Sequence, residues 1–265
     1  MSLLDIKNLK TYFHTRAGTT RAVDDISFSI DKGEIVGVVG ESGSGKSVTC
    51  HTLLGLLPQP PAKVEGGSVT FDGNELLDLP TPLLRAIRGK RISMIFQDPM
   101  SCLNPYLTIL DQVAEPILTH EDVTKDEAEG RAIEMMKKVG IRDAEKRART
   151  YPREFSGGMR QRAMIALAMA NEPDVLIADE PTTALDVTIQ AQILDVLRML
   201  QQERGLGVVL ITVLLAAMAG GSSLGTVDST PLMAERVGRA MFGPYVLVVE
   251  LAAFVLLAAL VVAAH

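Results

Sequence analysis

The octapeptide GESGSGKS at residues 40–47 restricts the fold of this chain more than any other segment. It matches the pattern G-x-x-x-x-G-K-[ST], in which glycines let successive backbone N–H groups turn toward a bound anion. The continuous apolar run Ile35–Val39 precedes it, and a helical pattern over Val48–Leu57 follows it. A buried strand, a glycine-rich loop and a helix in this order predict a phosphate-binding loop in an α/β fold with a parallel sheet.

Each residue type in this loop has a chemical task. The glycines expose backbone N–H groups, the Lys46 ammonium would neutralise phosphate oxygens, and the Ser47 hydroxyl would ligate Mg²⁺. The alternative, a flexible glycine turn, is disfavoured because a strand and a helix flank the loop as the motif requires. The residues expected to bind ATP here are Gly40, Ser42, Gly43, Gly45, Lys46 and Ser47.

The composition favours a globular protein and disfavours a disordered chain or a nucleic-acid-binding protein. The chain has 265 residues, 47% of them hydrophobic, and a formal net charge of −6, so it is long and apolar enough for a core and lacks the basic surface of a nucleic-acid-binding protein. Its two cysteines, Cys50 and Cys102, lie far apart without metal-site spacing, which favours a reducing compartment. The N-terminus has no signal-peptide pattern, so we expect a cytoplasmic location.

A second acidic element completes a nucleotide site. Val175–Ala178 is a buried-strand run that ends in Asp179 and Glu180, at the edge where an open α/β sheet presents its ligands. Asp179 is the expected Mg²⁺ ligand, and Glu180 is expected to orient and deprotonate the attacking water. Alone, a strand that ends in acidic residues is more often the start of a solvated loop. Together with the phosphate loop, it predicts a P-loop NTPase.

Alternating and apolar patterns predict the remaining elements. A proline- and glycine-rich connector is expected at residues 57–67, and a charged, helical pattern over residues 98–155 predicts an inserted helical subdomain. The other strands are expected at Leu3–Leu9, Val23–Ile30, Ser68–Phe71, Arg91–Phe96 and Val208–Thr212, with helices at Thr81–Arg88 and Val187–Glu203.

The segment FSGGMRQR at residues 155–162 is the third element, and with it the chain resembles the ATP-binding subunits of ABC transporters over about residues 1–212. Ser156, Gly157 and Gly158 open a helix and could form an anion site at its positive end. A plain helix N-cap would be the simpler interpretation of these residues alone. The resemblance implies that they contact the γ-phosphate of ATP bound to a partner subunit, and that the helical subdomain spans residues 98–165.

Smaller elements also line up with this family. Gln97 matches the glutamine that senses Mg²⁺ and the lytic water, and Asp186 in Ala184-Leu185-Asp186 matches a loop that reaches across the dimer. Phe13, with Tyr12 as second choice, matches the aromatic residue that stacks on adenine. An isolated aromatic residue near a strand end is more often part of the core.

Within the family, the sequence resembles most the ATP-binding subunits of oligopeptide and dipeptide importers. Nickel importers share much of the same sequence. The similar segments are FQDPMSCLNP at 96–105, YPREFSGGMRQR at 151–162 and ADEPTTALDVTIQAQIL at 178–194. The resemblance implies a second ATPase subunit, two transmembrane permease subunits and, indirectly, an extracytoplasmic peptide-binding protein as partners. It implies a peripheral position on the cytoplasmic face of the cell membrane, with the peptide bound by other subunits.

The resemblance stops near Thr212. Val213 stands where the family has a histidine that contacts the γ-phosphate, and the later elements of the domain are not recognisable, so the domain is expected to be truncated. Residues 213–236 are interpreted as a linker. Three hypotheses remain: an active ATPase subunit, a nucleotide-binding chain with impaired hydrolysis, and a membrane-inserted fragment without transport activity.

The last segment is apolar. Residues 245–264 carry one charge, Glu250, and as a helix they would span roughly 30 Å, the thickness of a bilayer's hydrocarbon core. A membrane anchor and an all-apolar core helix are the two interpretations. Residues 237–265 resemble the last membrane helix of the J-type subunit of NADH:quinone oxidoreductase, so we expect a chimeric or frameshift-like junction near Thr212–Val213.

Overall fold

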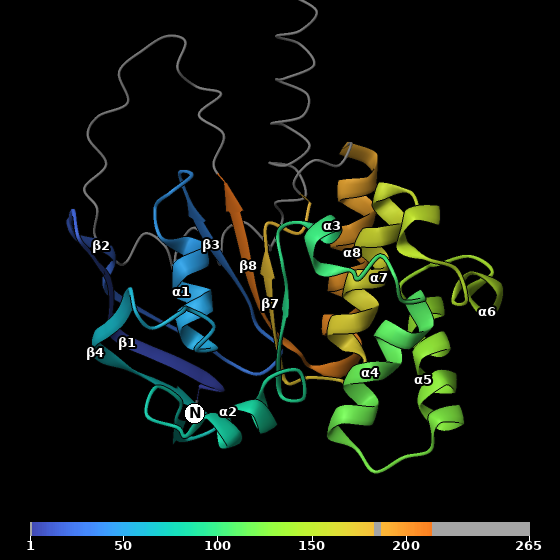
Figure 1. Cartoon of the computed structure of the whole chain (residues 1–265), viewed down its shortest axis with the longest axis horizontal. Coiled ribbons are helices and arrows are strands. Elements are labelled where there is room, and N and C mark those ends of the chain that lie inside the picture. Colours follow the sequence, from blue (N-terminus) through green and yellow to red (C-terminus); the bar gives the residue numbers. More distant parts are fainter. Residues whose placement is uncertain (1, 183–186, 214–265) are drawn as a thin grey trace, which may run out of the picture.

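The computed structural model describes residues 2–182 and 187–213, which form two four-stranded sheets and the helices around them (Figure 1). One sheet is antiparallel, with the order β2-β1-β4-β5. Alternating burial along β1 leaves one face of this sheet in the core. Its strands are β1 Leu4–Thr15, β2 Gly18–Ile30, β4 Ala62–Phe71 and β5 Asn74–Glu75.

The other sheet is parallel, with the order β3-β8-β7-β6. Its central strands are continuous apolar runs, as expected for strands buried on both faces. One strand, β8, therefore separates β3, which leads into the phosphate loop, from β7, which ends in the acidic pair. The strands are β3 Ile35–Gly40, β6 Ile92–Ile95, β7 Val175–Asp179 and β8 Gly207–Val213.

Helices follow most of the strands, and α3 to α7 come between β6 and β7 in the sequence. Threonine or serine side chains cap three of them: Thr108 before α4, Thr124 before α5 and Ser156 before α7 each accept a hydrogen bond from a backbone N–H of the first turn. The helices are α1 Lys46–Leu53, α2 Thr81–Ile87, α3 Pro99–Cys102, α4 Ile109–His120, α5 Lys125–Lys138, α6 Ala144–Arg147, α7 Gly157–Met169 and α8 Val187–Arg204, with a 3-10 turn at Pro152–Glu154.

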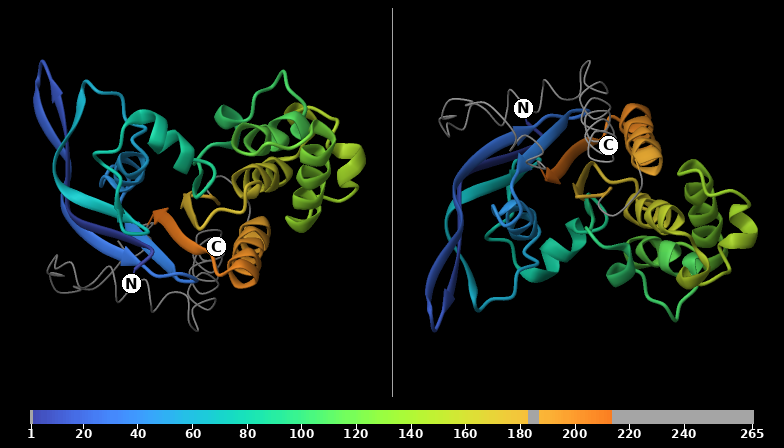
Figure 2. Two further views of the ribbon diagram at one scale, coloured as in Figure 1. Left: turned by 90° about the horizontal axis from the view of Figure 1, so that it is seen from below. Right: turned by 90° about the horizontal axis from the view of Figure 1, so that it is seen from above.

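The parallel sheet lies between two hydrophobic cores. Because side chains alternate along a strand, Val175 and Ile177 of β7 pack with α1 and the antiparallel sheet, whereas Leu176 and Ala178 pack with α4, α5, α7 and α8. Figure 2 shows these layers, with the antiparallel sheet and α1 apart from α4, α5, α7 and α8. Helices α1 and α7 therefore cover opposite faces of the parallel sheet.

The expected connector at residues 57–67 is wrong in its second half. Strand β4 begins at Ala62, because Ala62 and Lys63 pair with Phe13 and Tyr12 of β1. Cross-strand hydrogen bonds extend β1, β2 and β4 beyond the segments that side-chain alternation marks. The helix expected to reach Leu57 ends at Leu53, before Gly55 with its positive φ of 55°.

Several expectations lie outside the described residues. Asp186, residues 214–236 of the expected linker and the apolar segment 245–264 belong to residues 183–186 and 214–265. Val213, expected to begin the linker, is instead the last residue of β8, where it pairs with Gly40 of β3. Within residues 2–182 and 187–213, the structure contains no helix that is both long and apolar enough to cross a bilayer.

The phosphate loop contacts the antiparallel sheet at Gly45, which packs against the backbone of β2. Thr11 pairs with Val23 while Tyr12 pairs with Arg21, so Ala22 is an extra residue that forms a β-bulge in β2. A Cβ atom on Gly45 would lie 2.1 Å from the Ala22 carbonyl oxygen, and Gly45 has a φ of +91°. The bulge and the loop therefore meet at a distance that only glycine permits.

Gly43 offers a matched control for this contact. It also has a positive φ, +80°, but a Cβ there would meet nothing within 4 Å. We expect Gly43→Ala to cost about 1–2 kcal/mol of unfolding free energy from backbone strain alone. Gly45→Ala should cost about 3–5 kcal/mol, because the loop must also move away from Ala22. Urea denaturation of the two variants measures this difference. Equal losses of unfolding free energy would contradict a close contact between Gly45 and Ala22.

Candidate nucleotide site

A hydrogen bond joins the phosphate loop to the end of β7. The Ser47 hydroxyl, in the first turn of α1, donates to the Asp179 carboxylate at 3.0 Å, across 132 residues of sequence. Both residues lie at the carboxyl edge of the parallel sheet, since β3 and β7 run in the same direction. Of the three expected magnesium ligands, Ser47, Gln97 and Asp179, the first and the last are therefore adjacent.

The Asp179 carboxylate is held in a confined place, with 3% of the residue exposed. Burial raises the pKa of its carboxyl group, and the nearby Glu180 charge adds to this, while the Ser47 hydroxyl and the charges of His51 and Lys46 act in the opposite direction. Burial, with the Asp179 charge, also raises the pKa of the Cys50 thiol, which keeps that cysteine protonated and unreactive.

The Lys46 side chain folds back over its own loop. Its ammonium donates to the carbonyl oxygens of Gly40 at 2.8 Å and Glu41 at 2.6 Å, and to the Ser44 hydroxyl at 3.4 Å. Lys46 is only 8% exposed. All three partners are neutral oxygens, so a phosphate group that enters the loop would offer this cation a stronger, charged acceptor.

Gln97 and Glu180 meet at the same edge. The Gln97 side-chain amide, just after β6, donates to the Glu180 carboxylate at 2.7 Å. Glu180 has a φ of +46°, a left-handed conformation that is unfavourable for glutamate, and its N–H donates to the Ile211 carbonyl at 3.1 Å. The turn after β7 thus aims the carboxylate at Gln97 instead of continuing the strand.

The structure distinguishes the two candidate aromatic residues in β1. The Thr11 hydroxyl lies 3.1 Å from the Thr52 hydroxyl of α1, so Thr11 and, two residues on, Phe13 face the side of the sheet that carries α1. Tyr12 faces the other way, donates to Asp24 at 2.7 Å and has the Arg21 guanidinium 5.5 Å from its ring centre. Phe13 is therefore the better placed of the two to stack on a base.

Ser156, Gly157 and Gly158 are not part of the same cluster. The Ser156 hydroxyl accepts from the Met159 N–H at 3.4 Å, and Ser156 is exposed. Because α7 covers the face of the parallel sheet opposite to α1, the start of α7 does not close over the phosphate loop of its own chain. The structure thus brings together Lys46, Ser47, Gln97, Asp179 and Glu180, and leaves the glycine pair apart.

Comparison with known proteins shows which family this chain belongs to. Residues 23–183 match the family described as ABC transporter, a range that includes the phosphate loop, Gln97, Ser156 and both acidic residues. The chain belongs to the ABC transporter family. Its α/β fold with a P-loop, expected from the sequence, is confirmed.

The curated relatives of this ABC protein include transport ATP-binding proteins. The peptidoglycan transport ATP-binding protein YejF of Agrobacterium fabrum is 52% identical over 79% of this chain and 38% of the relative. The dipeptide transport protein DppD of Lactococcus lactis is 51% identical over 82% of this chain and 62% of the relative. The oligopeptide transport protein OppD of Bacillus subtilis is 48% identical over 79% and 59%. The chain thus spans less than two thirds of the length of these relatives.

Solved structures agree with the fold. A dimeric ATP-binding cassette in a post-hydrolysis state with ADP and phosphate superposes with a TM-score of 0.70 at 32% identity, over 79% of this chain and 87% of the other. The cbiO1 protein of Clostridium perfringens, described as part of the ABC transporter complex cbiONQ, gives 0.66 at 27% identity, over 80% of this chain and 78% of the other. The similarity covers most of each solved chain.

Oxygen ligands at the site suit Mg²⁺. A serine hydroxyl and an aspartate carboxylate stand side by side, and Mg²⁺ in nucleotide sites is held by one or two such protein oxygens together with phosphates and water. Among the described residues, no group of three or more histidine, cysteine, aspartate or glutamate residues forms a dedicated metal cage. The Ser47 hydroxyl and the Asp179 carboxylate are the residues that fit Mg²⁺ here.

Residues that the sequence does not single out make two further sets of contacts, one beside the site and one at the opposite edge of the parallel sheet. The His51 ring of α1 lies 6.1 Å from the Phe96 ring, next to Gln97, and Asn171 at the end of α7 bridges two other segments. A histidine within a helix carries no distinctive pattern. The Asn-Glu-Pro sequence at 171–173 signals only that a helix stops.

The raised pKa of Asp179 predicts how stability depends on pH. At pH values between the unfolded and the folded pKa, the folded chain binds more protons than the unfolded chain, so its stability falls as the pH rises through that range. The uncharged isostere Asp179→Asn should therefore increase the free energy of unfolding at pH 7. The increase should shrink as the pH is lowered toward 4.

Urea denaturation at several pH values measures this effect. Asp122→Asn, at an exposed position, is the control and should stay within about 0.5 kcal/mol of the unsubstituted chain. Destabilisation by Asp179→Asn at pH 7 would contradict the prediction.

Proposed function

We propose that this chain is the ATP-binding and ATP-hydrolysing subunit of an ABC importer for peptides, of the dipeptide or oligopeptide class. The observation that carries the proposal is the meeting of Ser47 with Asp179, and of Gln97 with Glu180, at one edge of the parallel sheet. The peptide class rests on relatives that are named as dipeptide and oligopeptide transport proteins and are about 50% identical.

In this proposal each side chain has a defined task. Backbone N–H groups of residues 40–47 and the Lys46 ammonium hold the phosphates of ATP. Ser47 and Asp179, with Gln97, would hold Mg²⁺, which supplies charge neutralisation at the transferring phosphoryl group. Glu180 accepts a proton from the attacking water, and the Gln97 amide holds the Glu180 carboxylate in place for that step. Phe13 stacks on the adenine ring.

The proposal requires two ATPase subunits. Ser156, Gly157, Gly158 and Asp186 are assigned to the nucleotide of the partner subunit. The exposure of Ser156 and Gly157, and the position of α7 on the sheet face opposite α1, support this assignment, since these two residues can be reached by another molecule. The superposing cassette is itself described as dimeric and bound to ADP and phosphate.

The remaining partners follow from the proposed class. Two permease subunits would carry the substrate across the membrane, and a peptide-binding protein would deliver it from outside. The chain would then act peripherally on the cytoplasmic face, and residues 245–264 would serve as an added anchor, since they carry a single charge in 20 residues. The helical region around residues 98–165 is proposed as the subdomain that carries the partner-facing glycines.

Two variants test nucleotide binding and hydrolysis separately. Lys46→Ala should weaken ATP binding at least tenfold, because the loop loses its only buried cation for the phosphates. Glu180→Gln should keep the affinity within about twofold and reduce hydrolysis at least a hundredfold, because an amide cannot accept the proton of water.

Isothermal titration calorimetry and a phosphate-release assay provide these two measurements. Lys63→Ala serves as the control, because Lys63 is an exposed lysine on β4 that is paired with Glu65. ATP binding by Lys46→Ala with unchanged affinity would contradict the assignment.

A second candidate function is a nucleotide-binding chain with impaired hydrolysis. Its support is the register of β8, in which Val213 pairs with Gly40 at the start of the phosphate loop. Residue 213 therefore sits beside the bound phosphates in this proposal, where the family's histidine would donate a hydrogen bond and a valine cannot.

Val213→His tests this candidate. If the missing donor limits the rate, the variant should hydrolyse ATP roughly ten times faster or more than the unsubstituted chain, because one hydrogen bond to the developing charge is restored. Val213→Leu keeps an apolar side chain without a hydrogen-bond donor and is the matched control. Equal rates for all three chains would remove the support for impairment at this position.

A further inference from the structure

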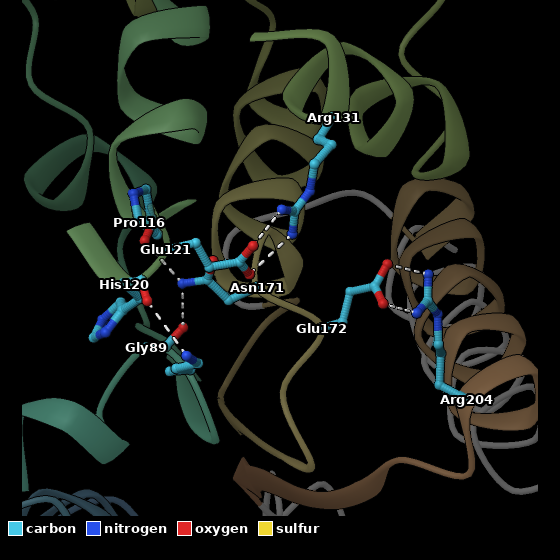
Figure 3. A network of polar contacts seen from close by, with 9 residues as sticks. Gly89, Pro116, His120, Glu121, Arg131, Asn171, Glu172 and Arg204 are labelled. Carbon is cyan, nitrogen blue, oxygen red and sulfur yellow. Dashed lines mark hydrogen bonds and ion pairs between the residues drawn. The ribbon is translucent and has the colours of Figure 1, made fainter. Parts of the chain in front are cut away.

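The C-terminal end of α7 is held by one side chain that bonds two other segments. The Asn171 amide nitrogen donates to the Gly89 carbonyl, in the turn before β6, and to the Pro116 carbonyl in α4, each at 3.0 Å (Figure 3). The two acceptors lie 82 and 55 residues away in sequence. One amide group therefore joins the end of α7, the edge of the parallel sheet and the helical region.

The site requires a donor of this particular kind. Asn171 is 8% exposed, and its amide oxygen is buried without a hydrogen-bond partner among the described residues. Both bonds use the –NH₂ group, which has two hydrogens, whereas a hydroxyl could serve only one of the two carbonyls. The two bonds are therefore made although the amide oxygen stays buried and unpaired. They fix how the end of α7, the turn before β6 and α4 meet, and we call this meeting point the junction.

Neighbouring contacts make the junction stiff. The Lys90 ammonium donates to the His120 carbonyl at 3.3 Å, beside the Asn171 bonds, and Arg131 of α5 forms a two-point ion pair with Glu121 at the end of α4. On the other side, Glu172 forms a two-point ion pair with Arg204 of α8 (Figure 3). The end of α7 is therefore held between α4 and α8.

The opposite end of α7 carries Ser156, Gly157 and Gly158, which the proposed function assigns to the partner's nucleotide. The helix has 13 residues, which at 1.5 Å per residue place Ser156 about 20 Å from Asn171. A rotation of about 10° around the Asn171 end would move the Ser156 end by about 3 Å over that length. A displacement of this size is enough to break a hydrogen bond to phosphate and, at a reacting centre, to cost about a hundredfold in rate.

We propose that Asn171 is a positioning residue that fixes the pivot of α7, and thereby the placement of Ser156, Gly157 and Gly158 for the partner's nucleotide. The catalytic part of this inference rests on the proposed ATPase function. The geometric part concerns the orientation of the helical region relative to the sheets and holds for the chain without nucleotide.

Spin labels test the geometric part. Asp126→Cys on α5 and Ser29→Cys on β2 are exposed positions, and Cys102→Ser removes the exposed native thiol while Cys50 stays buried. Double electron–electron resonance on the full-length chain gives the distance distribution between the labels. Asn171→Leu removes both donors at similar volume and should broaden or shift this distribution by several Å, whereas Gln201→Leu should not.

Gln201 is a matched control, because its side-chain amide also bonds a backbone carbonyl, that of Gly33, but joins α8 to the turn before β3. Asn171→Ser, which keeps one donor, should give an intermediate distribution and serves if Asn171→Leu does not fold. A folded Asn171 variant whose distribution superposes on that of the unsubstituted chain would overturn the proposal.

The catalytic part is measured by separating binding from turnover. Asn171→Leu should bind ATP within about twofold of the unsubstituted affinity, because the phosphate loop lies on the other sheet face, while kcat should fall about tenfold or more. An unchanged kcat in an otherwise active chain would contradict a positioning role. If the unsubstituted chain itself does not hydrolyse ATP, the proposed function fails, and the label distances alone decide the role of Asn171.

Discussion

The site depends on the hydrogen bond between Ser47 and Asp179, which is possible only because β3 and β7 run parallel with one strand between them. Parallel strands deliver their carboxyl ends to the same edge of a sheet, so a loop after one and an acidic pair after another can meet despite 132 intervening residues. The helical region is inserted between β6 and β7, and the sheet register is kept across it.

The elements that the sequence predicts correctly are those with strong local patterns. The phosphate loop, the apolar strands around it and the helix that begins after Ser156 are all present. Their local signals are glycines at fixed spacing, continuous apolar runs and an N-cap residue. The meeting of Asp179 with Ser47 also follows from the parallel sheet, since Asp179 ends β7 and Ser47 follows the loop at the end of β3.

The features that escape the sequence are those made by contacts between distant segments. Strand β4 begins five residues before Gly67 because β1 supplies backbone partners there, and side-chain alternation does not register such pairing. The bulge at Ala22 and the bridge made by Asn171 have the same origin. The choice of Phe13 over Tyr12 became clear only from the bond between Thr11 and Thr52.

The left-handed backbone of Glu180 has a practical consequence for protein engineering. A glutamate in this conformation costs roughly 1–2 kcal/mol relative to glycine, and it is retained by bonds from Gln97 and to Ile211. A library screened for thermostability alone would therefore enrich glycine or asparagine at position 180. Such a screen would discard the carboxylate while it improved the fold, so selection for heat resistance in this chain has to be coupled to an assay that requires residue 180.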